Sequence, residues 1–213
     1  MKVKISIVIL ILVSFFNMGA VSDSNMKANS FRNIESAFIN KSEFIENGSK
    51  IQYKTKNSIS NEKIRIEKYI LDKCSVDYKN IKIDKIEFFS KDMHIEIDLW
   101  RDNNYTYAAI TIVNSNTDYK TEELIGILKG LENEDFIEMQ CYKYYKGKIA
   151  FDKEDKYIKD IFNSIHNVNM ISINNGYTGS GYCADGEKIN FAISNYNTGT
   201  YIIIGTPIIF TTY

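Results

Sequence analysis

Four segments of the chain carry hydrophobic residues at helical spacing. The clearest begins at Thr121, where the apolar residues follow the i, i+3, i+4, i+7 pattern of an amphipathic helix and acidic residues occupy the first turn. We expect helices at 29–40 (Phe31, Ile34, Phe38), after a cap of Ser60 or Asn61 (Ile66, Ile70, Cys74), from Thr121 (Leu124, Ile127, Leu128, Leu131) and after a cap of Asp152 (Ile158, Ile161, Phe162, Ile165).

Between these helices, apolar and polar side chains alternate with the period of two that is typical of half-buried strands. The pattern is clearest in 92–100, where the polar positions are His94, Glu96 and Asp98. Turn residues separate many of the runs: Asp102-Asn103, Asp185-Gly186 and Asn197-Thr198-Gly199. The expected strands are 49–56, 80–89, 92–100, 104–113, 135–145, 168–174, 177–183, 187–194, 200–205 and 207–212.

This order of elements predicts an α+β fold. Short connections and hairpins favour a mostly antiparallel sheet with helices packed on one face. The order strand, helix, strands, helix and then strand, helix, strands predicts a pseudo-repeat with halves near 49–131 and 135–213. The two halves share element order rather than residues.

The N-terminus has the pattern of a secretory signal. Lys2 and Lys4 precede an apolar run over 5–16, and Ala20-Val21-Ser22 offers small residues for cleavage. We therefore expect residues 1–22 to direct export and 23–213 to form the folded domain. The alternative is an uncleaved N-terminal anchor, which would be the protein's contact with a membrane.

Composition and charge narrow the class of partner. The 213 residues are 44 % hydrophobic and 13 % aromatic, which is enough for a sizeable core and excludes general disorder. Removal of Lys2 and Lys4 lowers the basic count from 26 to 24 against 27 acidic residues, a net charge of −3. A nucleic-acid-binding protein normally carries a basic face, so no nucleic-acid partner is expected.

The three cysteines, Cys74, Cys141 and Cys183, form no CxxC pair, so they do not predict a zinc site. We expect three small buried residues, with a Cys141–Cys183 disulfide as the alternative.

His94, Glu96 and Asp98 form the most promising chemical cluster. Alternate residues of one strand lie about 6.5–7 Å apart, which is too wide for one metal ion unless other strands contribute ligands. The simpler interpretation is a solvent-facing strand surface. The other histidine, His166, is expected to cap a helix C-terminus. We therefore assign no catalytic, cofactor-binding or metal-binding residue.

Two short motifs have plain structural interpretations. The glycines of 176–181 match neither a dinucleotide fingerprint nor a phosphate loop and predict a strand that is kinked or closely approached by another backbone. Asn47-Gly48-Ser49 fits a glycosylation sequon, but matches of that length arise by chance.

The C-terminal third resembles the YwmB-like, or TATA-box-binding-like, family of exported proteins from Gram-positive spore-forming bacteria. The resemblance is carried by Asn175-Gly176-Tyr177-Thr178-Gly179, Asn190-Phe191-Ala192-Ile193, Tyr196-Asn197, Gly205-Thr206-Pro207-Ile208-Ile209 and Tyr213. It implies a curved antiparallel sheet, roughly duplicated, and a link to the cell wall or sporulation. Ser194 and Asn195 stand where many relatives have an Arg before the Tyr-Asn pair.

The sequence leaves three hypotheses for the function of the protein. The leading hypothesis is a non-enzymatic binding module of the cell envelope, with an envelope protein or a cell-wall glycan as partner and a surface that includes Tyr177, Tyr196, Asn197 and Thr206. An envelope hydrolase would need a pocket that joins at least two of His94, Glu96, Asp98, His166 and Cys183. Nucleic-acid binding is opposed by the carboxylates on the polar faces of the strands and by the export signal.

Overall fold

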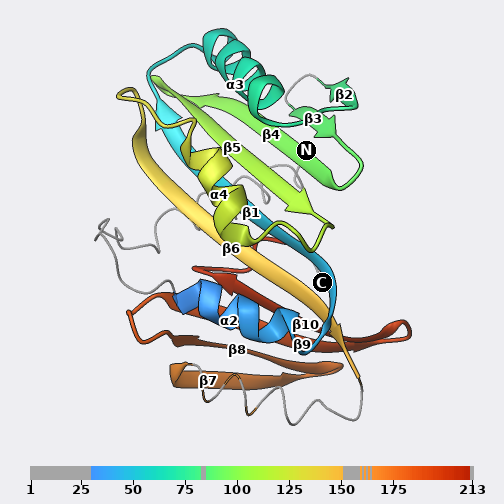
Figure 1. The fold of residues 1–213 in the computed structure, drawn as a ribbon. Helices are drawn as coiled ribbons and strands as arrows, with labels where there is room; N and C mark the ends of the chain where they lie inside the picture. Colours follow the sequence, from blue (N-terminus) through green and yellow to red (C-terminus); the bar gives the residue numbers. More distant parts are fainter. Residues whose placement is uncertain are drawn as a thin grey trace.

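The computed structural model describes residues 30–82, 85–150 and 165–211, together with Lys159, Ile161 and Asn163. These residues form an α+β fold in which three helices lie on one face of an open, antiparallel, ten-stranded sheet (Figure 1). The helices are α2 (Ser30–Ile39), α3 (Ile59–Lys73) and α4 (Thr121–Lys129). The strands are β1 (Glu43–Thr55), β2 (Tyr78–Ile81), β3 (Lys85–Phe89), β4 (Met93–Asp102), β5 (Tyr105–Asn114), β6 (Ile137–Ile149), β7 (His166–Ile173), β8 (Gly176–Tyr182), β9 (Lys188–Tyr196) and β10 (Gly199–Thr206).

The sheet is organised about its central pair, β1 and β6. On one side of this pair the order outward is β5, β4, β3, β2, and on the other side it is β10, β9, β8, β7. Each central strand is therefore followed in the chain by an outermost strand, and three antiparallel neighbours then lead back to the centre. The two ends of the sheet, β2 and β7, do not meet.

The hydrophobic core lies between the sheet and the helices and has two parts. Ile66 and Ile70 of α3 and Leu124 and Leu128 of α4 are buried against β1, β3, β4 and β5, as their spacing predicts. The predicted face of α2 (Phe31, Ile34, Phe38) is buried against β6, β9 and β10. The first helix of the described residues, α2, thus covers strands near the C-terminus (Figure 1).

The helix boundaries differ from the sequence prediction at one cap. Ser58, rather than Ser60 or Asn61, caps α3, because its hydroxyl accepts a hydrogen bond from the backbone N–H of Asn61 at 3.2 Å. In the predicted helix after Asp152, Ile161 and Ile165 are buried in the second core part. Asp152, Ile158 and Phe162 lie outside the described residues.

Three predictions near strand ends are wrong. The single strand expected at 80–89 is a hairpin of β2 and β3, in which Ile81 pairs with Ile86. No strand forms over 207–211, where Pro207 has no N–H to donate to a ladder and Phe210 packs edge-on against Tyr144 at a centroid distance of 4.9 Å. His166 begins β7 and does not end a helix.

None of the described helices is both long and apolar enough to span a bilayer.

Candidate functional site

The face of the sheet that carries no helix is hollowed beside the β9–β10 hairpin. The hollow is an open groove of about 640 Å³ lined by Ile45, Lys146, Asn195, Tyr196, Asn197, Thr198, Tyr201 and Ile203. Ile203 is buried in its floor, whereas Tyr196, Asn197 and Thr198 of the hairpin are exposed. The groove therefore combines an apolar floor with a rim of aromatic rings, amides and a hydroxyl.

Two tyrosines give the groove its aromatic surface. The hairpin turn at 197–198 carries the chain from Tyr196 on β9 to Tyr201 on β10, and the two rings pack at a centroid distance of 5.9 Å and an angle of 62°. The Tyr201 hydroxyl donates a hydrogen bond to Thr198 Oγ1 at 3.1 Å. Tyr196 as a whole residue is 42 % exposed, so a ligand can reach it.

Lys146 brings a positive charge to the same groove. It comes from β6, and its ammonium lies 5.8 Å from the centre of the Tyr201 ring and 3.8 Å from Glu46 Oε1. Tyr144 also donates a hydrogen bond to Glu46 Oε1 at 3.2 Å. Glu46 therefore balances part of the lysine charge and leaves the groove suited to neutral or weakly anionic ligands.

The structure brings two of the four sequence-predicted surface residues together. Tyr196 and Asn197 line the groove. Tyr177 pairs with Ile193 on the helix-covered face, and Thr206 is buried at the other end of β10. Tyr177 and Thr206 therefore belong to other surfaces, because side chains of alternate strand residues point to opposite faces.

Sequence reasoning missed Tyr201 and Lys146. The hairpin turn at 197–199 was a usable signal for Tyr201. Such a turn places the residues just before it beside those just after it, so Tyr201 could have been predicted to lie near Tyr196. The pairing of β10 with β6, which brings in Lys146, joins segments more than 50 residues apart and carries no local signal.

A second group of polar side chains lies on the same uncovered face, at the far end of the sheet. His94, Glu96 and Asp98 are half-buried along β4, as the alternation predicts, and Glu87 of β3 stands directly opposite Glu96. Lys85 Nζ lies 2.5 Å from Glu96 Oε2. Burial, with the charge of Glu96 beside it, raises the pKa of Asp98 to about 6.

Of the residues that a hydrolase would need, His94, Glu96 and Asp98 lie together on β4, whereas Cys183 and His166 lie apart from them. Cys183 is buried in the second core part, and His166 is exposed at the start of β7. Neither of these residues, nor His94, Glu96 or Asp98, lines the groove. None of the three cysteines forms a disulfide, so the Cys141–Cys183 alternative is wrong; Cys74 and Cys141 are half-buried and only Cys183 is fully buried.

The two short motifs have structural roles. Asn47 is buried, and its side-chain amide donates to Glu35 Oε1 at 3.1 Å and to the Tyr119 carbonyl at 2.8 Å, so the folded protein does not present the sequon. The glycines of 176–181 belong to β8, which is paired on both sides. A Cβ on Gly179 would lie 2.5 Å from the Asn169 carbonyl oxygen, which accounts for glycine there by close backbone approach.

The fold and the groove together define the structural class of this protein. It is an α+β protein built on an open, ten-stranded antiparallel sheet with an aromatic groove on the face that carries no helix. In comparisons with known proteins, no protein-family model matches the chain and no curated protein matches it.

Proposed function

We propose that this chain is an exported, non-enzymatic binding module of the cell envelope whose ligand is a cell-wall glycan. The observation that carries the proposal is the groove at the β9–β10 hairpin, where Tyr196, Tyr201, Asn197 and Lys146 surround an apolar floor. Export is supported by the signal-like segment 1–22. Membership of the YwmB-like family is part of the same proposal and is supported by the C-terminal residues that carry the resemblance.

The groove has the chemistry that a sugar chain requires. Pyranose rings present apolar C–H faces that pack on aromatic rings such as those of Tyr196 and Tyr201. Their hydroxyl and N-acetyl groups need donors and acceptors, which amides such as Asn197 supply. Lys146 adds an attraction for the carboxylates of peptidoglycan and the phosphates of wall polymers.

Binding of soluble peptidoglycan fragments tests this function. Calorimetric titration of residues 23–213 with a disaccharide-repeat oligomer of N-acetylglucosamine and N-acetylmuramic acid is expected to give saturable binding. Asn197→Ala and Tyr196→Ala change exposed side chains and should each weaken binding at least tenfold. Tyr78→Ala is the matched control, because Tyr78 is an exposed tyrosine of β2 at the opposite end of the sheet.

The result that would overturn the glycan proposal is an absence of binding at millimolar oligomer, or equal binding by the Tyr196 and Tyr78 variants. An envelope protein as partner, the other form of this function, would instead appear as cross-linking through the hairpin in intact cells without glycan binding. Hydrolysis of the oligomer during titration would favour the alternative of an envelope hydrolase. The uncovered face around β4 carries Glu96 and Asp98, which would repel phosphate, so nucleic-acid binding is disfavoured.

A further inference from the structure

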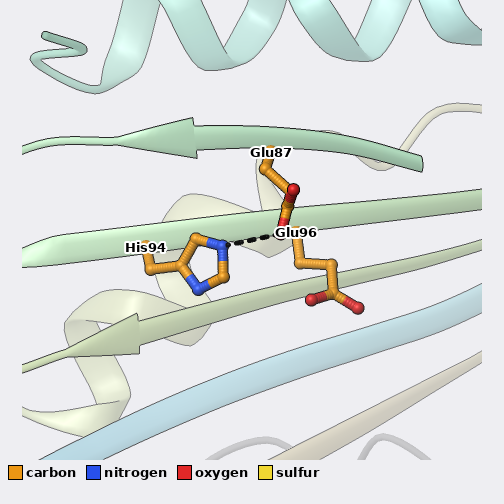
Figure 2. A group of neighbouring side chains, drawn as sticks. All are labelled: Glu87, His94 and Glu96. Carbon is orange, nitrogen blue, oxygen red and sulfur yellow. Dashed lines mark ion pairs between the residues drawn. The ribbon is translucent and has the colours of Figure 1, made fainter. Parts of the chain in front are cut away.

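We propose that Glu87, His94 and Glu96 form a binding site for one divalent transition-metal ion of the zinc class on the uncovered face of the sheet (Figure 2). This site is separate from the groove and does not depend on its ligand. From the sequence, alternate residues of one strand are too widely spaced to hold a metal ion unless another strand contributes a ligand; the neighbouring strand β3 contributes Glu87.

The geometry of the cluster follows from strand register. Glu87 on β3 is the direct partner of Glu96 on β4, and His94 lies two residues before Glu96 on the same face. One ligand atom from each of the three residues lies within 4.8 Å of the others. Ligand atoms on a tetrahedral zinc ion lie roughly 3.4 Å apart, given bonds of about 2.0–2.1 Å. Rotations of these half-buried side chains are enough to close the difference.

The ring of His94 is placed to supply a ligand. Its Nε2 atom is buried and has no hydrogen-bond partner among the described residues, although such atoms are ordinarily paired; the side chain as a whole is 36 % exposed. Figure 2 shows this nitrogen turned toward Glu87, whose Oε1 lies 3.6 Å away. The ring is held by stacking on Phe89 at a centroid distance of 4.5 Å and an angle of 8°. The imidazole is thus oriented toward the Glu87 carboxylate before any ion arrives.

Two lysine ammonium groups would compete with a metal ion for the carboxylates of this site. Glu87 and Glu96 face each other across a strand pair, an arrangement that is unfavourable without a cation between them. In the structure Lys85 Nζ lies 2.5 Å from Glu96 Oε2 and 3.9 Å from Glu87 Oε1, and Lys82 Nζ lies 3.2 Å from Glu87 Oε2. Lys85 and Lys82 are 31 % and 62 % exposed, so both ammonium groups can move into solvent when a metal ion binds.

The donor set selects the metal. An imidazole nitrogen with two carboxylates suits zinc and its neighbours, whereas magnesium and calcium prefer oxygen ligands only. Three protein ligands leave coordination positions for water. Asp98 and Lys50 lie on the same face and add one charge of each sign nearby, so they do not change the net charge of the site.

A titration of the tag-free protein, residues 23–213, with Co²⁺ and then Zn²⁺ tests the proposal. At pH 7, after treatment with a chelator, we expect one Co²⁺ per chain with visible d–d absorption that Zn²⁺ displaces. Glu96→Gln and His94→Ala should each weaken binding at least tenfold. Lys85→Met removes the competing ammonium and should strengthen binding several-fold, an effect that a merely structural disturbance would not produce.

His166→Ala is the matched control, because it removes the other histidine from an exposed position on β7. Absence of saturable binding up to millimolar metal would overturn the proposal, as would binding that His166→Ala abolishes and His94→Ala does not. Since His94 also packs on Phe89, near-ultraviolet circular dichroism should show that its variant is folded. Glu87→Gln keeps the side-chain shape and should weaken binding in the same way.

Discussion

The carboxylate of Glu35 accepts two hydrogen bonds from Thr121: one from its hydroxyl at 2.7 Å and one from its backbone N–H at 3.1 Å. Glu35 belongs to α2 and Thr121 is the first residue of α4, so this contact joins the helices that cover the two parts of the core. Asn47 of β1 donates a third hydrogen bond to the same carboxylate and links both helices to the centre of the sheet.

Removal of this carboxylate should destabilise the whole fold. Glu35→Ala leaves the buried hydroxyl of Thr121 and the amide of Asn47 short of an acceptor, so the free energy of unfolding should fall by about 2–4 kcal/mol. Urea unfolding followed by circular dichroism measures the change. Asn33→Ala, on the exposed side of α2, should stay within about 0.5 kcal/mol of the parent. Equal stability of the two variants would contradict the assigned role.

Glu62 predicts how stability depends on pH. Burial alone would raise its pKa, but hydrogen bonds from Arg65 at 2.5 Å and from the Tyr53 hydroxyl at 2.6 Å outweigh burial and lower the pKa below the ordinary value of 4.5. A carboxyl with a lowered folded pKa stabilises the protein above its unfolded pKa. That stabilisation is lost as the pH falls below 4.5 toward the folded pKa.

Unfolding free energies of the parent and Glu62→Gln between pH 7 and pH 3 test this dependence. The variant should be the less stable protein at pH 7, by about 2–4 kcal/mol, because its neutral amide leaves Arg65 without its charged partner. The gap should narrow as the pH falls below 4.5. A gap that stays constant down to pH 3 would show that Glu62 does not titrate in this range.

Replacement of glycine by alanine should have opposite effects on stability at two positions, Gly48 and Gly126. A Cβ on Gly48 of β1 would lie 2.4 Å from Cε1 of the Tyr144 ring and 2.7 Å from the Ile112 carbonyl oxygen, so Gly48→Ala should cost about 2 kcal/mol or more. Gly126 lies on the exposed side of α4 with no atom within 4 Å of such a Cβ, so Gly126→Ala should stabilise the helix by about 0.5–1 kcal/mol. Thermal unfolding of both variants checks the signs. A stabilising Gly48→Ala would mean that β1 and β6 pack less closely than described.

Local patterns predicted most of the elements because their causes are local. The apolar spacing in α2, α3 and α4 identifies the faces that are buried, and the predicted turn at 102–103 joins β4 to β5 in a hairpin. The failures are also local in origin. Both arms of the β2–β3 hairpin carry apolar residues such as Ile81 and Phe88, so the sequence pattern predicts one strand where the structure has two.

The candidate sites were predictable only in part. The sequence alone identifies Tyr196 and Asn197, and both line the groove, but Lys146 enters it from β6, which pairs with β10 although the paired residues are more than 50 positions apart in the chain. The sequence predicts a cluster of His94, Glu96 and Asp98, whereas Glu87 joins His94 and Glu96 through the register of β3 against β4. In both sites the missing member comes from the neighbouring strand, because a strand's own sequence specifies spacing along it and not what lies beside it.

The sequence by itself therefore determined the fold class, the helix faces and most strand positions, since side-chain periodicity reports which face of an element is buried. The tertiary structure alone decided the order of the ten strands and the packing of α2 on β6, β9 and β10. It alone also decided the hydrogen bond from Thr121 to Glu35. These features depend on contacts between residues far apart in the chain. Such contacts arise when buried surfaces and polar groups find their partners in three dimensions, and no local pattern records them.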